Sequence, residues 1–237
     1  MNETIQVLMN RKSVRVFEDK EITPEIKDII LAAAMRAPTG GNCMPYSIID
    51  VTDQSIKDKL AETCDHQPFI AQAKMVLIFC ADYHRWYRKF KMAGCEDIPA
   101  PELSNMVLAT EDAVIAAHTA CIAAESLGIG SCYIGDIVEN FEIHKELLNL
   151  PPQVAPLCML VFGYPTQQQK ERKQPTRFAK SSIVFENQYR ELSEEELLEM
   201  MPNDRTKAFY NRKYISDFAQ EMVRSTKEIY KNWNSKE

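Results

Sequence analysis

The chain has 237 residues, of which 45% are hydrophobic and 26% charged, and its formal net charge at pH 7 is −6. These values are ordinary for a globular protein of one domain, and the acidic balance argues against a nucleic-acid binder that depends on phosphate contacts. The apolar runs at 75–81 and 157–162 are too short to cross a bilayer, and residues 1–9 lack the basic start of a signal peptide, so we expect a cytoplasmic protein without membrane contact.

The first half of the chain reads as helices alternating with strands. Thr23 is a suitable N-cap, Pro24 fits the first helical position, and Pro38 disfavours helical geometry in the residue before it. The apolar patterns predict helices at 3–10, 23–36 and 54–63, a loop of small residues at 39–43, and strands at 46–51 and 75–81. The unbroken apolar run at 75–81 suits a buried strand.

In the second half, the longest periodic segment covers residues 105–127 and is apolar nearly all round a helix. Such a helix must be buried on several sides, either in the core or between two subunits. Strands at 131–134 and 156–162, a helix near 141–148 and a capping box from Ser193 to Glu196 follow. Strands separated by helices indicate a layered α/β or α+β fold, and the C-terminal third is polar and helical.

The seven cysteines are scattered, at positions 43, 64, 80, 95, 121, 132 and 158, and no two have CxxC spacing. In a chain without a secretion signal they are expected to be reduced and mostly buried. The four histidines are also scattered and form no HExxH motif, so we expect no metal site.

Glycine is scarce and unevenly placed. Six of the seven glycines border predicted strands, at 40–41, at 128, 130 and 135, and at 163. Gly128 and Gly130 are interpreted as ordinary caps and turns, whereas Gly40, Gly41 and Gly135 are equally compatible with close approach of a ligand. No GxGxxG or GxxxxGK motif is present, so a nucleotide would bind in another mode.

Positive charge gathers in three islands, at 11–15, 170–180 and 205–213. In an extended segment Arg11, Ser13 and Arg15 would share one face. Two guanidinium groups and a hydroxyl on one face suit a phosphate, although solvated surface is the commoner role of such a cluster.

Several segments in this order resemble the nitroreductase and flavin reductase family, and most closely its oxygen-insensitive, NADPH-preferring class. They are RKSVRVF (11–17), APTGGNCMPY (37–46), QPFIAQAKMVLIFCADYH (67–84), GIGSCYIGD (128–136), FGYP (162–165), PTRF (175–178) and ENQY (186–189). The resemblance covers about residues 5–190. It implies an α+β fold with a mixed central sheet flanked by helices, in an intertwined homodimer with FMN in two equivalent interface pockets. Residues 1–237 would form one FMN-binding domain, with about 190–237 as a helical C-terminal extension.

The resemblance also implies roles for individual residues. Arg11 and Ser13 would hold the FMN phosphate and ribityl chain, with Lys12 at a basic position of the class. Arg15 would lie toward the pyrimidine edge, where its charge tunes the redox chemistry of the flavin. Gln67 would reach the ring edge. The remaining cofactor-binding positions are Pro38, Thr39, Gly40 and Asn42 from the other subunit, the backbone of Tyr133, Ile134 and Gly135, and Arg177 at the phosphate.

Three departures from the family pattern are visible. Gly40 and Gly41 replace common serines, Met44 replaces a common glutamine, and Pro175 stands where the phosphate-binding lysine is expected. Lys173 is the candidate replacement for that lysine. Cys43 and Cys132 lie nearest the expected site, where a buried packing role is favoured over redox activity.

The implied activity is that of an FMN-dependent NAD(P)H oxidoreductase, which reduces nitroaromatics, quinones or free flavins by ping-pong hydride transfer through flavin N5. Because the cofactor carries the chemistry, no catalytic side chain is required. Arg205, Arg212 and Lys213 are the candidate residues for the NADPH 2′-phosphate, and NADH remains open as donor. The alternatives are a flavin-binding storage or regulatory protein without turnover and a related reaction such as reductive dehalogenation.

Overall fold

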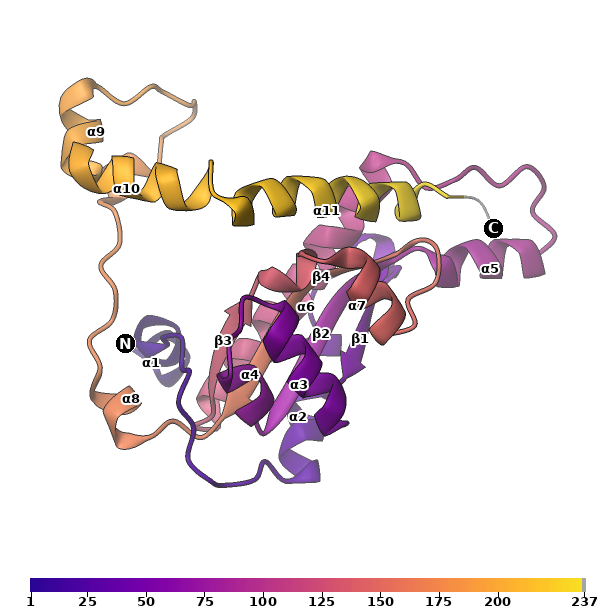
Figure 1. Ribbon diagram of the computed structural model, residues 1–237, viewed down its shortest axis with the longest axis horizontal. Coiled ribbons are helices and arrows are strands. Elements are labelled where there is room, and N and C mark those ends of the chain that lie inside the picture. Colours follow the sequence, from indigo (N-terminus) through magenta and orange to yellow (C-terminus); the bar gives the residue numbers. More distant parts are fainter. Residues whose placement is uncertain (236–237) are drawn as a thin grey trace. The chain divides into compact units, whose positions relative to one another are not determined.

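The computed structural model describes residues 1–235, and its centre is a four-stranded sheet (Figure 1). The strands are β1 (Tyr46–Asp50), β2 (Met75–Asp82), β3 (Gly130–Ile134) and β4 (Val154–Gly163), in the order β1-β2-β4-β3. All eight residues of β2 are buried, as the unbroken apolar run predicted. All four predicted strands are confirmed.

The expected mixed sheet is wrong in one respect, because every pair of neighbouring strands among the described residues is antiparallel. Strands β2 and β3 run in the same direction, but β4 lies between them and pairs antiparallel with each. Within residues 1–235, parallel pairing occurs only at an isolated bridge between Ser13 and Ser131. The α+β class is confirmed.

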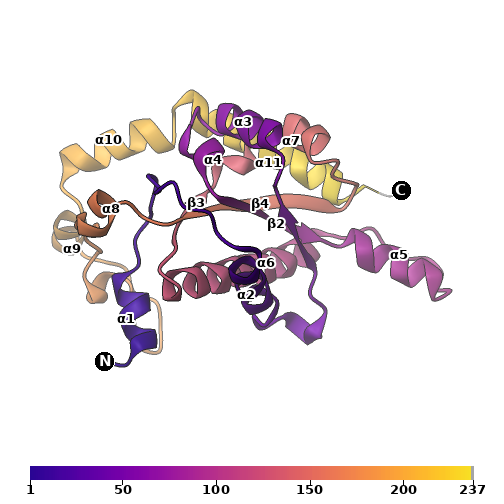
Figure 2. The same cartoon turned by 90° about the horizontal axis from the view of Figure 1, so that it is seen from below.

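Helices cover both faces of the sheet (Figure 2). Along β2, Met75, Leu77 and Phe79 belong to one apolar cluster, whereas Val76 and Ile78 belong to the other, because successive side chains of a strand point to opposite faces. Helices α2 (Pro24–Met35) and α6 (Leu103–Ser126) cover the first face. The second face carries α3 (Gln54–Thr63), α4 (Phe69–Gln72), η2 (Asp136–Val138), α7 (Phe141–Leu147) and the end of α11 (Asp217–Trp233).

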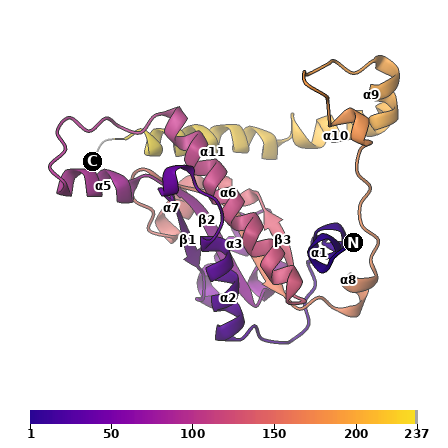
Figure 3. The same ribbon diagram turned by 180° about the vertical axis from the view of Figure 1, so that it is seen from behind.

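Helix α6 crosses the sheet in front of the strands in Figure 3. Eight of its residues are buried, most of them alanines, which let the helix approach the sheet and α2 closely. Its other face is exposed and carries four large apolar residues, Val107, Leu108, Val114 and Ile115, exposed by 40–59%, around the exposed Glu111 and His118. The helix is therefore a core helix that also carries an uncovered apolar surface, which we call the α6 outer face and define by these four residues.

In the described part of the chain, α6 is also the one helix with a length and apolar composition sufficient to cross a bilayer. The short apolar runs considered above did not reveal this. Because the helix packs on β1, β2, β3, β4 and α2, the buried part of its apolar surface belongs to the core of the fold, and the exposed part includes the α6 outer face.

The remaining helices are mostly short. They are α1 (Glu3–Asn10), η1 (Gly40–Asn42), α5 (His84–Met92), α8 (Gln167–Glu171), η3 (Lys180–Ser182), α9 (Glu194–Met200) and α10 (Asn203–Lys213). Local capping explains two predicted helix starts. Thr23 Oγ1 accepts from the Ile26 N–H at the start of α2, and Ser193 and Glu196 form the expected capping box of α9.

The chain divides into two compact units. The first comprises Met1–Arg172 together with the residues from Ser225 on, and the second comprises Lys173–Arg224. The second unit buries few side chains. Its contacts include the ion pair between Arg190 and Glu196 at 2.6 Å and the aromatic pair Phe185–Tyr189.

Candidate functional site

The basic segment at 11–17 lies along the edge of β3, and two glycines make this possible. The Val14 N–H donates to the Ser131 carbonyl at 2.9 Å. A Cβ atom on Gly130 would lie 2.5 Å from Val14 Cγ2, and one on Gly163 would lie 2.6 Å from the Phe17 ring. Gly130 is therefore required for close packing, which its interpretation as an ordinary turn missed. Gly128, at φ +75°, is the expected helix cap.

Side chains alternate along this segment as the sequence predicted. Val14 is buried, while Ser13 is half-buried and Arg15 is exposed. Burial raises the pKa of Cys132, and the nearby Arg15 charge and hydrogen bonds from Ser13 and Arg15 oppose that rise. Arg11 lies near Glu125. Burial raises the pKa of Glu125, and the positive charges of Arg11 and Lys12 oppose part of that rise. Ser13 and Arg15 thus come from one face of an extended segment.

Lys12 has a different environment from its neighbours. Its Nζ donates to the carbonyl oxygens of Lys170 at 2.6 Å and Arg172 at 2.5 Å, at the end of α8. The Arg172 guanidinium in turn donates to the Ser13 carbonyl. Arg172 is thus a cation beside the 11–15 segment that sequence reasoning passed over in favour of Lys173, although both lie in the same basic island.

Gln67 lies at the end of β3, beside the predicted backbone segment. Its amide Nε2 donates to the Asp136 carboxylate at 2.7 Å and to the Cys64 carbonyl at 2.8 Å. Phe69, two residues on, has its ring centroid 6.0 Å from the Arg15 guanidinium carbon. Neither Asp136 nor Phe69 was predicted from the sequence.

The side chains of the predicted flavin-face segment point into the two apolar clusters. Ile134 is buried on one face of the sheet and Tyr133 packs on the other. Burial raises the pKa of Tyr133, and its hydroxyl has no hydrogen-bond partner in the described structure. A Cβ on Gly135 would have no atom within 4 Å. Gly135 therefore has open space beside it, and the backbone contacts expected of Tyr133, Ile134 and Gly135 stay predictions.

The loop of small residues is organised by a carboxylate on α6. Asp112, which is buried, accepts from the Thr39 hydroxyl and from the Gly40 N–H at 3.2 Å. Thr39 Oγ1 also accepts from the Met44 N–H at 2.8 Å, and Asn42 adopts a positive φ of 55°. The sequence analysis did not single out Asp112. The feature that could have revealed it is a carboxylate at a position that falls among the buried residues of an otherwise apolar helix.

This loop borders a cavity of about 630 Å³, which is separate from the group around Arg11, Ser13, Arg15 and Gln67. Pro38, Thr39 and Gly40 line one side, and the other lining includes Trp86, Phe90, Leu108 and Asp112. The lining contains none of Arg11, Ser13, Arg15 and Gln67. Within one chain, the predicted cofactor residues of the first unit therefore form two groups.

The remaining predicted residues belong to the second unit. Arg177 is exposed and donates to the Pro175 carbonyl at 3.4 Å. Arg205 lies in the first half of α10, and Arg212 and Lys213 lie in its last turn, with Lys213 Nζ 4.3 Å from the centroid of the Phe218 ring. Their roles stay predictions.

The seven cysteines are free thiols, of which five are buried. Cys132 is buried as expected. Cys43 is exposed, contrary to the expected buried packing role: it lies in a loop with positive φ angles at Gly41, Asn42 and Met44 and lines the cavity beside that loop.

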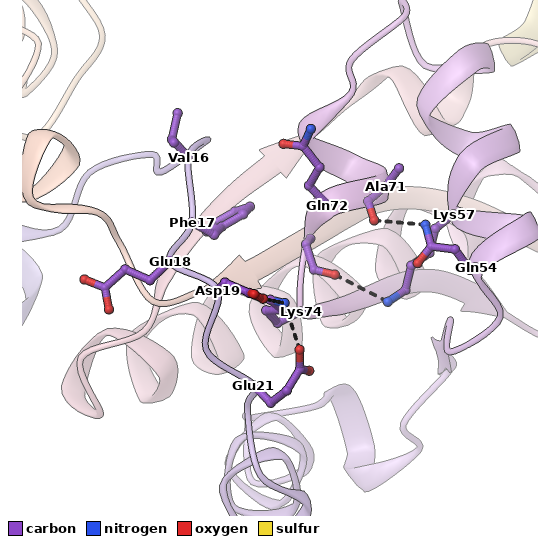
Figure 4. A pocket seen from close by; sticks show the side chains of 11 residues that line it. Val16, Phe17, Glu18, Asp19, Glu21, Gln54, Lys57, Ala71, Gln72 and Lys74 are labelled. Carbon is purple, nitrogen blue, oxygen red and sulfur yellow. Dashed lines mark hydrogen bonds and ion pairs between the residues drawn. The ribbon is translucent and has the colours of Figure 1, made fainter.

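A second cavity, of about 490 Å³, contains none of the predicted residues and is shown in Figure 4. Lys74 lies between Asp19 at 2.6 Å and Glu21 at 2.8 Å, so it ties the chain before α2 to the start of β2. On the other side Lys57, whose pKa is lowered by burial, donates to the Ala73 carbonyl at 3.3 Å. The charged side chains that form these contacts therefore hold neighbouring segments together, which is a structural role.

Comparison with known proteins places the chain in a family. The model of the nitroreductase family matches residues 8–164, and the chain belongs to this family. It is 32% identical to the FMN reductase (NADPH) of Bacillus subtilis over 229 residues, covering 96% of this chain and 88% of that one. It is 34% identical to the oxygen-insensitive NADPH nitroreductase of Salmonella typhimurium over 194 residues, covering 82% and 78% of the two chains.

Solved structures agree. The B. megaterium NfrA1 structure has a TM-score of 0.84 at 28% identity, with 98% of this chain and 99% of that chain covered. The NADPH:FMN oxidoreductase of Vibrio harveyi, solved with NAD+, has a TM-score of 0.81 at 27% identity, with 97% and 98% covered. The predicted family and fold are therefore confirmed.

Proposed function

We propose that this protein is an FMN-dependent NAD(P)H oxidoreductase that passes electrons to nitroaromatics, quinones or free flavins in a ping-pong cycle. The observation that carries the proposal is that the basic segment with Arg11, Ser13 and Arg15 lies along β3, near the open space at Gly135 and the amide of Gln67. The names of the relatives, which are NADPH-dependent reductases of flavins and nitro compounds, support it.

The donor set fits FMN. Guanidinium and hydroxyl donors suit the phosphate and ribityl chain, and Arg15 would place positive charge near the ring. When bound, FMN supplies the group that accepts and returns hydride. The chain itself holds the ring at the end of β3 and leaves space above Gly135. Lys12, Pro38, Thr39, Gly40, Asn42 and Arg177 remain proposed cofactor-binding residues, and Arg172 joins them.

We further propose a homodimer in which the α6 outer face binds a second copy of the chain. Four large apolar residues on one exposed helix face favour such burial. Within one chain, the loop at 38–44 and the group around Arg11–Arg15 lie apart. A second copy of the chain would bring its own loop at 38–44 to that group. Residues 1–237 would act as one domain, with the helices from about 190 as an extension, in the cytoplasm.

The test is to purify the protein, measure bound FMN, and mix it with NADPH or NADH without oxygen. We expect the flavin absorbance to bleach, and to return when a quinone, a nitroaromatic or free FMN is added. A protein that neither contains nor binds FMN would refute the proposal. A yellow protein that neither donor reduces would favour the storage alternative.

A further inference from the structure

The orientation of the Gln67 amide follows from chemistry alone. A primary amide nitrogen has two N–H groups, and both are used: one donates to the Cys64 carbonyl at 2.8 Å and the other to the Asp136 carboxylate at 2.7 Å. A carbonyl oxygen and an ionised carboxylate can only accept. Rotating the amide by 180° would set its oxygen against two acceptors, so the nitrogen is assigned to this side. The group that Gln67 has left for a ligand is its carbonyl oxygen.

Asp136 is well placed to fix this orientation. It begins the turn η2 directly after Gly135, the open glycine at the end of β3. Its carboxylate is close to Cys64, whose pKa is raised first by burial and then by the negative charge of Asp136. The carboxylate thus accepts from Gln67 at the start of η2 while the Cys64 carbonyl accepts from it at the end of α3, so the amide is held from two elements.

We propose that Asp136 is a positioning residue, which holds Gln67 with its oxygen toward the ligand so that the site recognises an N–H on the ring edge. The inference rests on the proposed FMN function. The oxidised isoalloxazine ring has one N–H, at N3, and its other edge heteroatoms accept hydrogen bonds. Gln67 therefore recognises N3–H, while Arg15, whose guanidinium can only donate, serves the neighbouring acceptors.

The consequence is selectivity for an imide edge. A flavin methylated at N3 keeps the ring but has no hydrogen to donate, so it would leave the Gln67 oxygen without a partner. We expect the wild-type apoprotein to bind FMN roughly tenfold more tightly than N3-methyl-FMN, the effect of one lost hydrogen bond.

The variants separate orientation from charge. Asp136→Asn removes the charge but keeps an amide oxygen that can accept from Gln67, so the preference for FMN over N3-methyl-FMN should survive. Asp136→Leu removes the acceptor, frees the amide to turn, and should reduce the preference to about twofold or less. Gln67→Leu removes the acceptor itself and should do the same, which keeps the test valid if Asp136→Leu fails to fold.

The chain offers a matched control outside the site. The amide of Gln54 also donates to one carbonyl, of Ala71 at 3.1 Å, and one carboxylate, of Asp58 at 2.8 Å. Asp58→Leu should therefore leave both dissociation constants unchanged, and thermal unfolding of each apoprotein shows whether it is folded.

The readout is the ratio of the two dissociation constants, measured by flavin fluorescence quenching. A wild-type ratio in Asp136→Leu, or equal losses in Asp136→Asn and Asp136→Leu, would overturn the positioning role. A wild-type protein that binds FMN without preferring it over the N3-methyl form would also overturn it, while leaving the proposed function intact. A wild-type protein that binds neither flavin would reject the proposed function, and the inference with it.

Discussion

His144 is fully buried between η2 and α3, where Nδ1 lies 2.9 Å from the Ile137 carbonyl oxygen and Nε2 lies 2.8 Å from the Thr63 hydroxyl. Because a carbonyl can only accept, Nδ1 must carry a proton. Burial lowers the pKa of His144 below its ordinary value of 6.5, and hydrogen bonds with the backbone of Ile137 and Glu139 oppose this. The neutral ring is thus favoured in the folded protein.

This predicts a pH dependence of stability. As the pH falls below about 6.5, the unfolded chain takes up a proton on His144 that the folded chain refuses until a lower pH, so the free energy of unfolding should decrease. Urea unfolding of the wild type and His144→Gln over this range measures it. The variant should lose part of the slope, whereas the same change at the exposed His118 should not. An unchanged slope in His144→Gln would contradict the assignment.

At the scale of elements, the contact between the basic segment and the edge of β3 depends on an absent side chain at Gly130. Gly130→Ala would place a methyl group 2.5 Å from Val14 Cγ2, so the segment at 13–17 must move. We expect a loss of about 1–3 kcal/mol in stability, typical of overpacking, and weaker FMN binding because Ser13 and Arg15 shift with the segment. Thermal unfolding and FMN titration measure these effects.

Two further variants test the cause. Gly130→Ala combined with Val14→Ala removes the two Cγ atoms from the clash and should recover part of the FMN affinity. Gly40→Ala, which meets no atom within 4 Å, should leave the melting temperature unchanged. If Gly130→Ala alone bound FMN as the wild type does, the seating of the basic segment would not matter for the cofactor.

At the scale of the whole molecule, the α6 outer face is the surface on which the proposed homodimer depends. Val114→Glu would place a charge where the side chain is 42% exposed in the single chain. If this face binds a second copy, the buried charge should dissociate the dimer and release FMN, because an unpaired buried charge is costly. Sedimentation velocity and bound-flavin content measure this. Ile143→Glu on α7, at 43% exposure, is the matched control and should stay dimeric.

The second unit carries the prediction about the electron donor. Replacing Arg212 and Lys213 together by alanine should raise KM for NADPH several-fold and leave KM for NADH unchanged, since only NADPH has a 2′-phosphate for these cations to bind. Steady-state kinetics with both donors tests it, with Lys207→Ala in the same helix as control. An equal rise in both KM values would reject the role in donor choice.

Local signals in the sequence were enough for the four strands and several helices, but not for the short helices α4, α5 and α8. The burial of Val14 between a half-buried Ser13 and an exposed Arg15 follows from the geometry of an extended segment, in which successive side chains point to opposite sides. Asp112, Asp136 and Arg172 escaped prediction because their partners are far away in the chain. Asp112 meets Thr39 and Gly40 across 72 or 73 positions, and Arg172 meets Ser13 across 159.

The local patterns of the sequence by themselves determined the four strands and several helices, because periodicity, caps and turn residues act over a few residues. The family and the α+β class followed from the resemblance of several segments in the same order. Only the tertiary structure decided how the strands are ordered, since β4 enters the sheet between β2 and β3. It also decided that Gly130 and Gly163 serve close packing, and which acceptors hold the Gln67 amide. These features depend on contacts between distant segments, and such contacts exist only once the chain has packed.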